Sequence, residues 1–73
     1  MYFPRLESLR KEKGNTQQQI ADYLTCQREV YRRYEKGITE LPFSYAIILA
    51  KKYNVTLDYL SGVSNDKKPF PTK

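Results

Sequence analysis

Apolar side chains recur at helical spacing in five separate stretches of the chain. Leu6 and Leu9 mark the first stripe, which predicts a helix over residues 4–13. The other stripes predict helices over residues 17–23, 27–34, 43–52 and 57–61. The pattern therefore predicts a compact, all-α domain of five helices.

Residue types typical of helix ends separate these stretches. Thr16 and Gln19 have the spacing of a capping box at the start of the second helix. Asn54 is expected to adopt the left-handed conformation that ends the fourth helix. Thr56 is a good N-cap for the fifth helix, and Gly62 ends it.

The fourth helix is apolar around most of its circumference. Its main stripe consists of Ala46, Leu49, Ala50 and Tyr53. Ile47 and Ile48 widen that stripe. A helix of this kind is buried, so we expect it to be the central element of the domain.

Residues 16–35 combine a short apolar helix with a helix that has two different sides. The second of these helices has Tyr31 and Tyr34 on one side. Its other side carries Arg28, Glu29, Arg32 and Arg33. The tyrosines could stack on single-stranded bases, but their spacing favours a place in the core. Tyr23 could serve either purpose.

This arrangement resembles the helix-turn-helix of the phage repressor and Cro-like (XRE-like) DNA-binding family, over about residues 6–60. Gln17 stands where the family has a glutamine at the start of its first motif helix. Ala21 fills the small position where the two helices touch, and Tyr31 the buried position of the second. Residues 35–37 match the Glu-x-Gly sequence that closes the motif.

The resemblance also implies a structural ion pair between Arg10 and Glu35, which would hold the third helix against the first. The chain departs from the family pattern at two positions. Thr25 stands where the family has glycine at positive φ, a costly conformation for a β-branched residue. Gln27 replaces the usual serine or threonine cap of the second motif helix. Cys26 between them is read as a small buried hydrophobe.

The resemblance implies a transcriptional regulator that binds double-stranded DNA, with repression as the simplest role. The candidate DNA contacts are Gln17, Gln27, Arg28, Glu29, Arg32, Arg33, Lys36 and Thr39. We expect Arg28 and Arg33 to read bases, because arginine can bind guanine with two hydrogen bonds. Arg32 is expected to contact phosphate. Glu29 could accept from cytosine N4 or could orient a neighbouring arginine.

Composition narrows the classes of function. The chain has a net charge of +5, no histidine and one cysteine. Such a basic balance is compatible with a nucleic-acid partner. The absence of histidine argues against a His-based catalytic triad and the common zinc sites, so no enzyme activity, metal or cofactor is expected. No signal peptide is expected, and the longest apolar run (45–50) is too short for a bilayer, which suggests a cytoplasmic protein.

Residues 1–63 are predicted to form the DNA-binding domain and residues 64–73 a flexible tail, in which Phe70 has no evident partner. One recognition helix reads few base pairs, so a homodimer on a palindromic operator is expected, with Tyr59 and Val63 as the possible dimer contact. No membrane or small-molecule partner is indicated. The alternative is an antitoxin-like or adaptor protein that uses the same scaffold to bind a protein.

Overall fold

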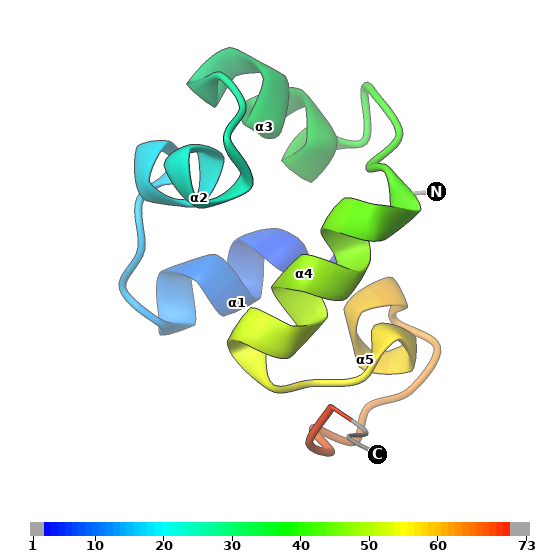
Figure 1. Cartoon of the computed structure of the whole chain (residues 1–73). Helices are drawn as coiled ribbons and strands as arrows, with labels where there is room; N and C mark the ends of the chain where they lie inside the picture. Colours follow the sequence, from blue (N-terminus) through cyan, green and yellow to red (C-terminus); the bar gives the residue numbers. More distant parts are fainter. Residues whose placement is uncertain (1–2, 71–73) are drawn as a thin grey trace.

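The computed structural model describes residues 3–70, and this part of the chain contains five α-helices and no strand (Figure 1). The helices are α1 (Leu6–Glu12), α2 (Gln17–Leu24), α3 (Arg28–Lys36), α4 (Phe43–Tyr53) and α5 (Leu57–Ser61). Each begins and ends within two residues of its predicted bounds. The predicted all-α fold is therefore confirmed.

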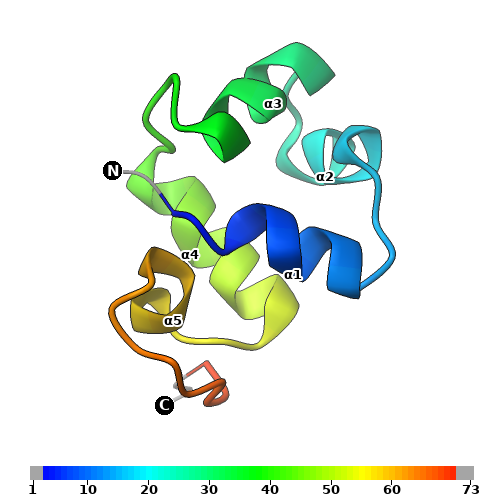
Figure 2. The ribbon, with the colours of Figure 1, turned by 180° about the vertical axis from the view of Figure 1, so that it is seen from behind.

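The helices are arranged so that α3 lies at one end of the domain. Figures 1 and 2 show it beside α2, with α1 and α4 across the middle and α5 toward the opposite end. The closest packing between elements joins α2 to α3 and α4 to α5. This arrangement leaves the outer side of α3 facing away from the rest of the chain.

The helix ends follow the predicted capping residues. The Thr16 hydroxyl accepts from the Gln19 N–H at 3.1 Å, and the Gln19 side chain accepts from the Thr16 N–H at 2.9 Å. Asn54 ends α4 at φ 56°, and the Thr56 hydroxyl accepts from the Tyr59 N–H at 3.1 Å. The largest shift at a helix start is in α1, which begins two residues later than predicted because the chain still forms a turn at residues 4–5.

Thr25 adopts the left-handed conformation itself, with φ 58° and ψ 42°. In this conformation its N–H donates to the Asp22 carbonyl at 3.1 Å, and the next N–H, of Cys26, donates to the Ala21 carbonyl at 2.9 Å. These bonds cap the end of α2, as a glycine would allow. The conformation costs about 1–2 kcal/mol for a residue with a side chain. The turn of the motif is therefore kept at the expense of local strain.

One side of every helix contributes side chains to the hydrophobic core. Its largest fully buried side chains are Tyr31, Leu6, Leu9, Ile20, Leu49 and Leu60. Ala21 is completely buried in α2, and Cys26 is half-buried against the core. Tyr34 lies at the edge of the core, where its ring meets Tyr45 edge to face at 6.1 Å. These positions confirm the core interpretation of Tyr31, whereas Tyr34 and Cys26 are partly buried at the edge of the core.

The fourth helix is less buried than its composition predicted. Its main stripe, Ala46, Leu49, Ala50 and Tyr53, is buried. Phe43 is 65% exposed and Ile48 is 38% exposed. The predicted burial of α4 therefore holds for its main stripe and fails for Ile48 at the edge of that stripe. The physical reason is that a small domain supplies partners for only part of the circumference of α4.

A buried ion pair joins α1 to α3. The Arg10 Nε donates to Glu35 Oε2 at 2.5 Å, and the two residues are 8% and 3% exposed. The Arg10 Nη1 also donates to the Asn15 carbonyl at 3.0 Å. The hydrogen bond to Glu35 raises the pKa of Arg10. The predicted pair is thus present, and it fixes the C-terminal half of α3 against α1.

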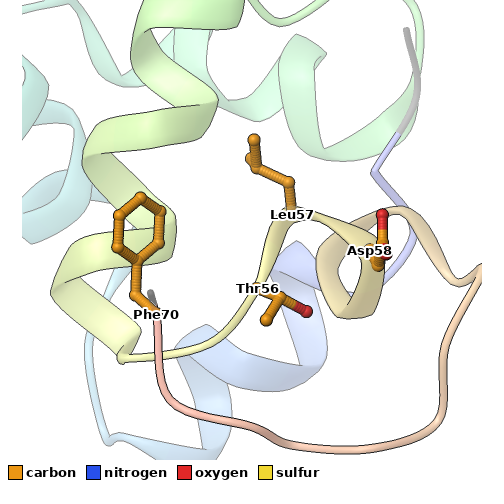
Figure 3. Close-up of a pocket in the computed structure, with 4 residues that line it drawn as sticks. All are labelled: Thr56, Leu57, Asp58 and Phe70. Carbon is orange, nitrogen blue, oxygen red and sulfur yellow. The ribbon is translucent and has the colours of Figure 1, made fainter. Parts of the chain in front are cut away.

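The described part of the predicted tail lies against the domain. Asn65 accepts from Arg5 at 2.5 Å, and Lys67 pairs with Glu12. Phe70, which had no evident partner in the sequence, packs against the core, and its N–H donates to the Asn54 side chain at 3.1 Å. Figure 3 shows its ring beside an open hollow at the start of α5. Residues 71–73 lie outside the described residues, and the flexibility of the tail stays a prediction.

No helix within residues 3–70 is long and apolar enough to span a membrane.

Candidate nucleic-acid interface

The third helix has a buried side and an exposed side. Tyr31 and Glu35, one turn apart, are buried and attach α3 to the core. Arg28, Glu29 and Arg33 are exposed on the helix. The amphipathic pattern of the sequence produces this division, because burial of Tyr31 turns the residues on the opposite side toward solvent. An exposed, basic helix next to α2 has the form of a recognition helix.

Glu29 binds two of the arginines on this helix. Its carboxylate accepts from Arg32 Nε at 3.0 Å and from Arg32 Nη2 at 2.7 Å, in a bidentate arrangement. It also accepts from Arg33 Nε at 3.4 Å. We call Glu29, Arg32 and Arg33 the α3 charge cluster. The hydrogen bond from Arg32, followed by the charges of Arg32 and Arg33, lowers the pKa of Glu29 to about 2.

Arg28 differs from the two arginines of the α3 charge cluster. It is the first residue of α3 and is exposed. Its side chain makes no hydrogen bond or ion pair with any other residue between 3 and 70. Gln27, directly before it, is exposed, and its side chain makes no capping hydrogen bond to α3, which agrees with its prediction as a poor cap. The N-terminal end of α3 therefore presents a guanidinium free to bind a ligand.

Gln17 lies at the start of α2 and contacts α3. Its side-chain amide donates to Glu35 Oε1 at 3.1 Å, so Gln17 belongs to the ion-pair network of Arg10 and Glu35. The sequence did not reveal this contact, because it joins residues from different helices. An amide group carries two N–H bonds, so one remains for a phosphate. The phosphate contact of Gln17 stays a prediction.

The loop after α3 carries the remaining candidates. Lys36 Nζ lies 3.6 Å from Glu7 Oε1, in an exposed pair that joins α3 to α1. Thr39 is exposed in the loop. Ile38, which no sequence pattern marked as a candidate, is 66% exposed in this loop and lies close in sequence to the exposed Phe43. The phosphate contacts of Lys36 and Thr39 stay predictions.

The candidate dimer residues lie on and after α5. Tyr59 is half-buried and packs against the core, and the guanidinium carbon of Arg5 is 4.2 Å from the centre of its ring. Tyr59 is therefore more covered than the sequence suggested, because the start of the chain returns over it. Val63 is 80% exposed.

Tyr23, for which the sequence left two interpretations open, is 52% exposed, with Lys52 Nζ 4.5 Å from its ring centre.

Comparisons with known proteins agree with this geometry. The sequence model of the helix-turn-helix family matches residues 6–60. Two uncharacterised HTH-type transcriptional regulators of Bacillus subtilis strain 168 are similar over nearly the whole chain. YobD is 35% identical over 69 residues, which cover 94% of this chain and 62% of YobD. YqaE is 40% identical over 68 residues, which cover 92% of this chain and 59% of YqaE.

A more distant relative is an uncharacterised HTH-type transcriptional regulator of Rickettsia conorii, RC0668, which is 28% identical over 68 residues. The match covers 92% of this chain and 54% of that protein, so the chain spans less than two thirds of the length of these relatives. No solved structure matches the chain. The family match over most of the chain has one consequence: the protein belongs to the phage repressor and Cro-like (XRE-like) helix-turn-helix family of transcriptional regulators.

Proposed function

We propose that this chain binds double-stranded DNA in a sequence-specific manner and represses transcription by occupying an operator. The observation that carries the proposal is the outer side of α3, a helix packed against α2, which carries the exposed Arg28 and Arg33 and the partly exposed Arg32. The major groove admits one α-helix, and an arginine can bind the O6 and N7 atoms of guanine with two hydrogen bonds. The membership of the chain in a family of regulators supports the same conclusion.

Within this proposal, the residues of α3 have different roles. Arg28 and Arg33 read bases, and Arg32 contacts phosphate. The assignment of Arg28 is supported by its side chain, which is exposed and has no partner among the described residues. Backbone contacts are assigned to the residues that surround the recognition surface: Gln17, Gln27, Lys36 and Thr39. Contacts of this kind fix the register of the protein on the duplex and carry no sequence information directly.

The proposed binding unit is a homodimer on a palindromic site. One recognition helix reads too few base pairs to select a site from a genome, whereas two helices related by a two-fold axis read two half-sites about 34 Å apart. We assign the contact to Tyr59 and Val63, and of these Val63 has more uncovered surface. Stoichiometry on a palindrome and on an isolated half-site tests this, with Val63→Glu as the variant. Independent binding of one chain to each half-site would refute the dimer.

The experiment that tests the function is a selection from random duplex DNA followed by a salt titration. Binding to phosphates releases counterions, so log affinity should fall linearly with log salt concentration, by about 0.9 for each phosphate contact on a duplex. Arg28→Ala should then change the ranking of selected sites, while Gln17→Ala should weaken all sites alike. An enriched sequence with a steep slope supports the proposal. No enrichment and no slope would favour the adaptor or antitoxin-like function.

A further inference from the structure

Most of the positive charge on α3 is paired with a carboxylate within the domain. Arg32 and Arg33 contact Glu29, and Lys36 contacts Glu7. The Glu29 carboxylate lies three and four residues before its two arginines on the same helix. It therefore stands on the surface that would face DNA, where a negative charge opposes binding to phosphates. The stabilisation of the fold does not explain this cost, because exposed ion pairs contribute little.

We propose that Glu29 is a specificity-determining residue that acts through the α3 charge cluster. The inference rests on the proposed DNA-binding function. Glu29 fixes the side chains of Arg32 and Arg33 and lowers the net charge of the recognition surface. Random duplex DNA offers mainly phosphates, so it gains little from arginines whose charge is already compensated. A correct site gains more, because arginines oriented in advance lose less conformational freedom when they bind.

The contact geometry leaves the binding ends of both arginines available. A guanidinium has five N–H donors. Arg32 uses its Nε and Nη2 on Glu29, and Arg33 uses only its Nε. Each side chain therefore keeps Nη hydrogens for a second acceptor. Glu29 can stay bound while Arg33 donates to a base edge and Arg32 donates to a phosphate, and this is how a carboxylate can position a base-reading group without touching the base.

The test compares three variants on two DNA substrates. The variants are Glu29→Gln, which removes the charge, Glu29→Asp, which keeps the charge but shortens the side chain, and Asp22→Asn as a control. Asp22 lies on α2, and its carboxylate accepts from Gln18 at 2.8 Å, with no arginine bonded to it. Glu29→Gln and Asp22→Asn thus change the net charge equally, but only the first alters the α3 charge cluster. The substrates are the selected site and a random duplex of equal length.

Glu29→Gln should bind random duplex about three- to tenfold more tightly, with a salt slope steeper by about one to two. Its affinity for the selected site should rise less, so the ratio of the two affinities should fall. Glu29→Asp should lose part of this ratio despite its unchanged charge, because it cannot reach both arginines. Asp22→Asn should change both affinities alike. Circular dichroism checks that each variant is folded. We expect all three to fold, because both carboxylates are exposed in the unmodified chain.

Two outcomes would overturn the inference and leave the proposed function intact. In the first, Glu29→Gln and Asp22→Asn behave alike on both substrates, so that Glu29 contributes only charge. In the second, Glu29→Asp retains the full ratio of affinities of the unmodified chain, so that the geometry of the cluster is irrelevant. A failure of the proposed function looks different, because the unmodified chain would then select no sequence and show no salt dependence.

Discussion

Replacing Arg10 by methionine should destabilise the domain strongly. The substitution keeps much of the apolar stem of the side chain and removes the guanidinium, so the Glu35 carboxylate, 3% exposed, loses its main partner. Among residues 3–70, the Gln17 amide then remains as a side-chain donor to it. Breaking a buried pair on one side costs about 3–5 kcal/mol. A domain of this length has a total stability of about 4–11 kcal/mol, so Arg10→Met should remove a large share of it.

Urea unfolding followed by circular dichroism measures this loss. With a slope of about 1 kcal/mol per molar urea for a small domain, the midpoint should fall by about 3 M or more. The matched control is Lys11→Met on the next residue, whose pair with Glu7 is exposed. An exposed pair contributes about 0–1 kcal/mol, so this midpoint should move little. The double variant Arg10→Met with Glu35→Leu should recover most of the loss, because it leaves no charge buried.

Two results would refute this account of the Arg10–Glu35 pair. If Arg10→Met has the same urea midpoint as Lys11→Met, the Arg10–Glu35 pair is hydrated in solution and contributes little to the free energy of unfolding. If the double variant is as unstable as the single one, the loss comes from packing around the arginine stem and the stranded carboxylate is irrelevant.

Three further outcomes are expected. Thr25→Gly should raise the melting temperature, because release of about 1–2 kcal/mol of strain at φ 58° exceeds the roughly 0.5–1 kcal/mol entropic cost of glycine; an unchanged or lower value in calorimetry would contradict the strain. Arg28→Ala or Arg33→Ala should cost about 1–3 kcal/mol on the preferred site and relax one base position in a repeated selection, and an unchanged ranking of sites would exclude base reading. In a carbon-detected NMR titration Glu29 should show a pKa of about 2, and Arg32→Ala should move it toward the usual value of about 4.3. Since folding lowers this pKa, the small stabilisation from the Glu29–Arg32 pair is present above pH 4.3 and lost as pH falls toward 2. A Glu29 titration midpoint that Arg32→Ala does not move would exclude Arg32 as the cause of the low pKa.

The features predicted well from the sequence depend on neighbours in the chain. Helix ends are of this kind, since Thr16 and Gln19 cap α2 from three residues apart. The contacts of Glu29 with Arg32 and Arg33 also occur at three- and four-residue spacing. For this reason the sequence alone already suggested an orienting role for Glu29 as one of two alternatives. The Arg10–Glu35 pair is different. Only the family resemblance implied it, because the residues are far apart in the chain.

The features that the sequence did not reveal depend on how distant segments pack. Gln17 reaches Glu35 only because α2 and α3 fold against each other. Arg5 covers Tyr59, and Asn54 binds Phe70, also between residues that are far apart in the chain. Composition also overstated the burial of α4, because the number of apolar residues on a helix does not fix how many neighbours the fold supplies. Phe43 and Ile48 stay partly exposed for this reason.

The division of α3 into two sides has a consequence for how regulators of this kind diverge. The residues that attach the helix to the core, Tyr31 and Glu35, are distinct from the exposed Arg28 and Arg33. Under the proposed function, a duplicated gene could therefore acquire a new operator through a few surface substitutions that leave the hydrophobic core untouched. The two copies would then cease to compete for the same promoter while both remained folded. A genome can in this way hold many regulators on one scaffold with little cross-talk among them.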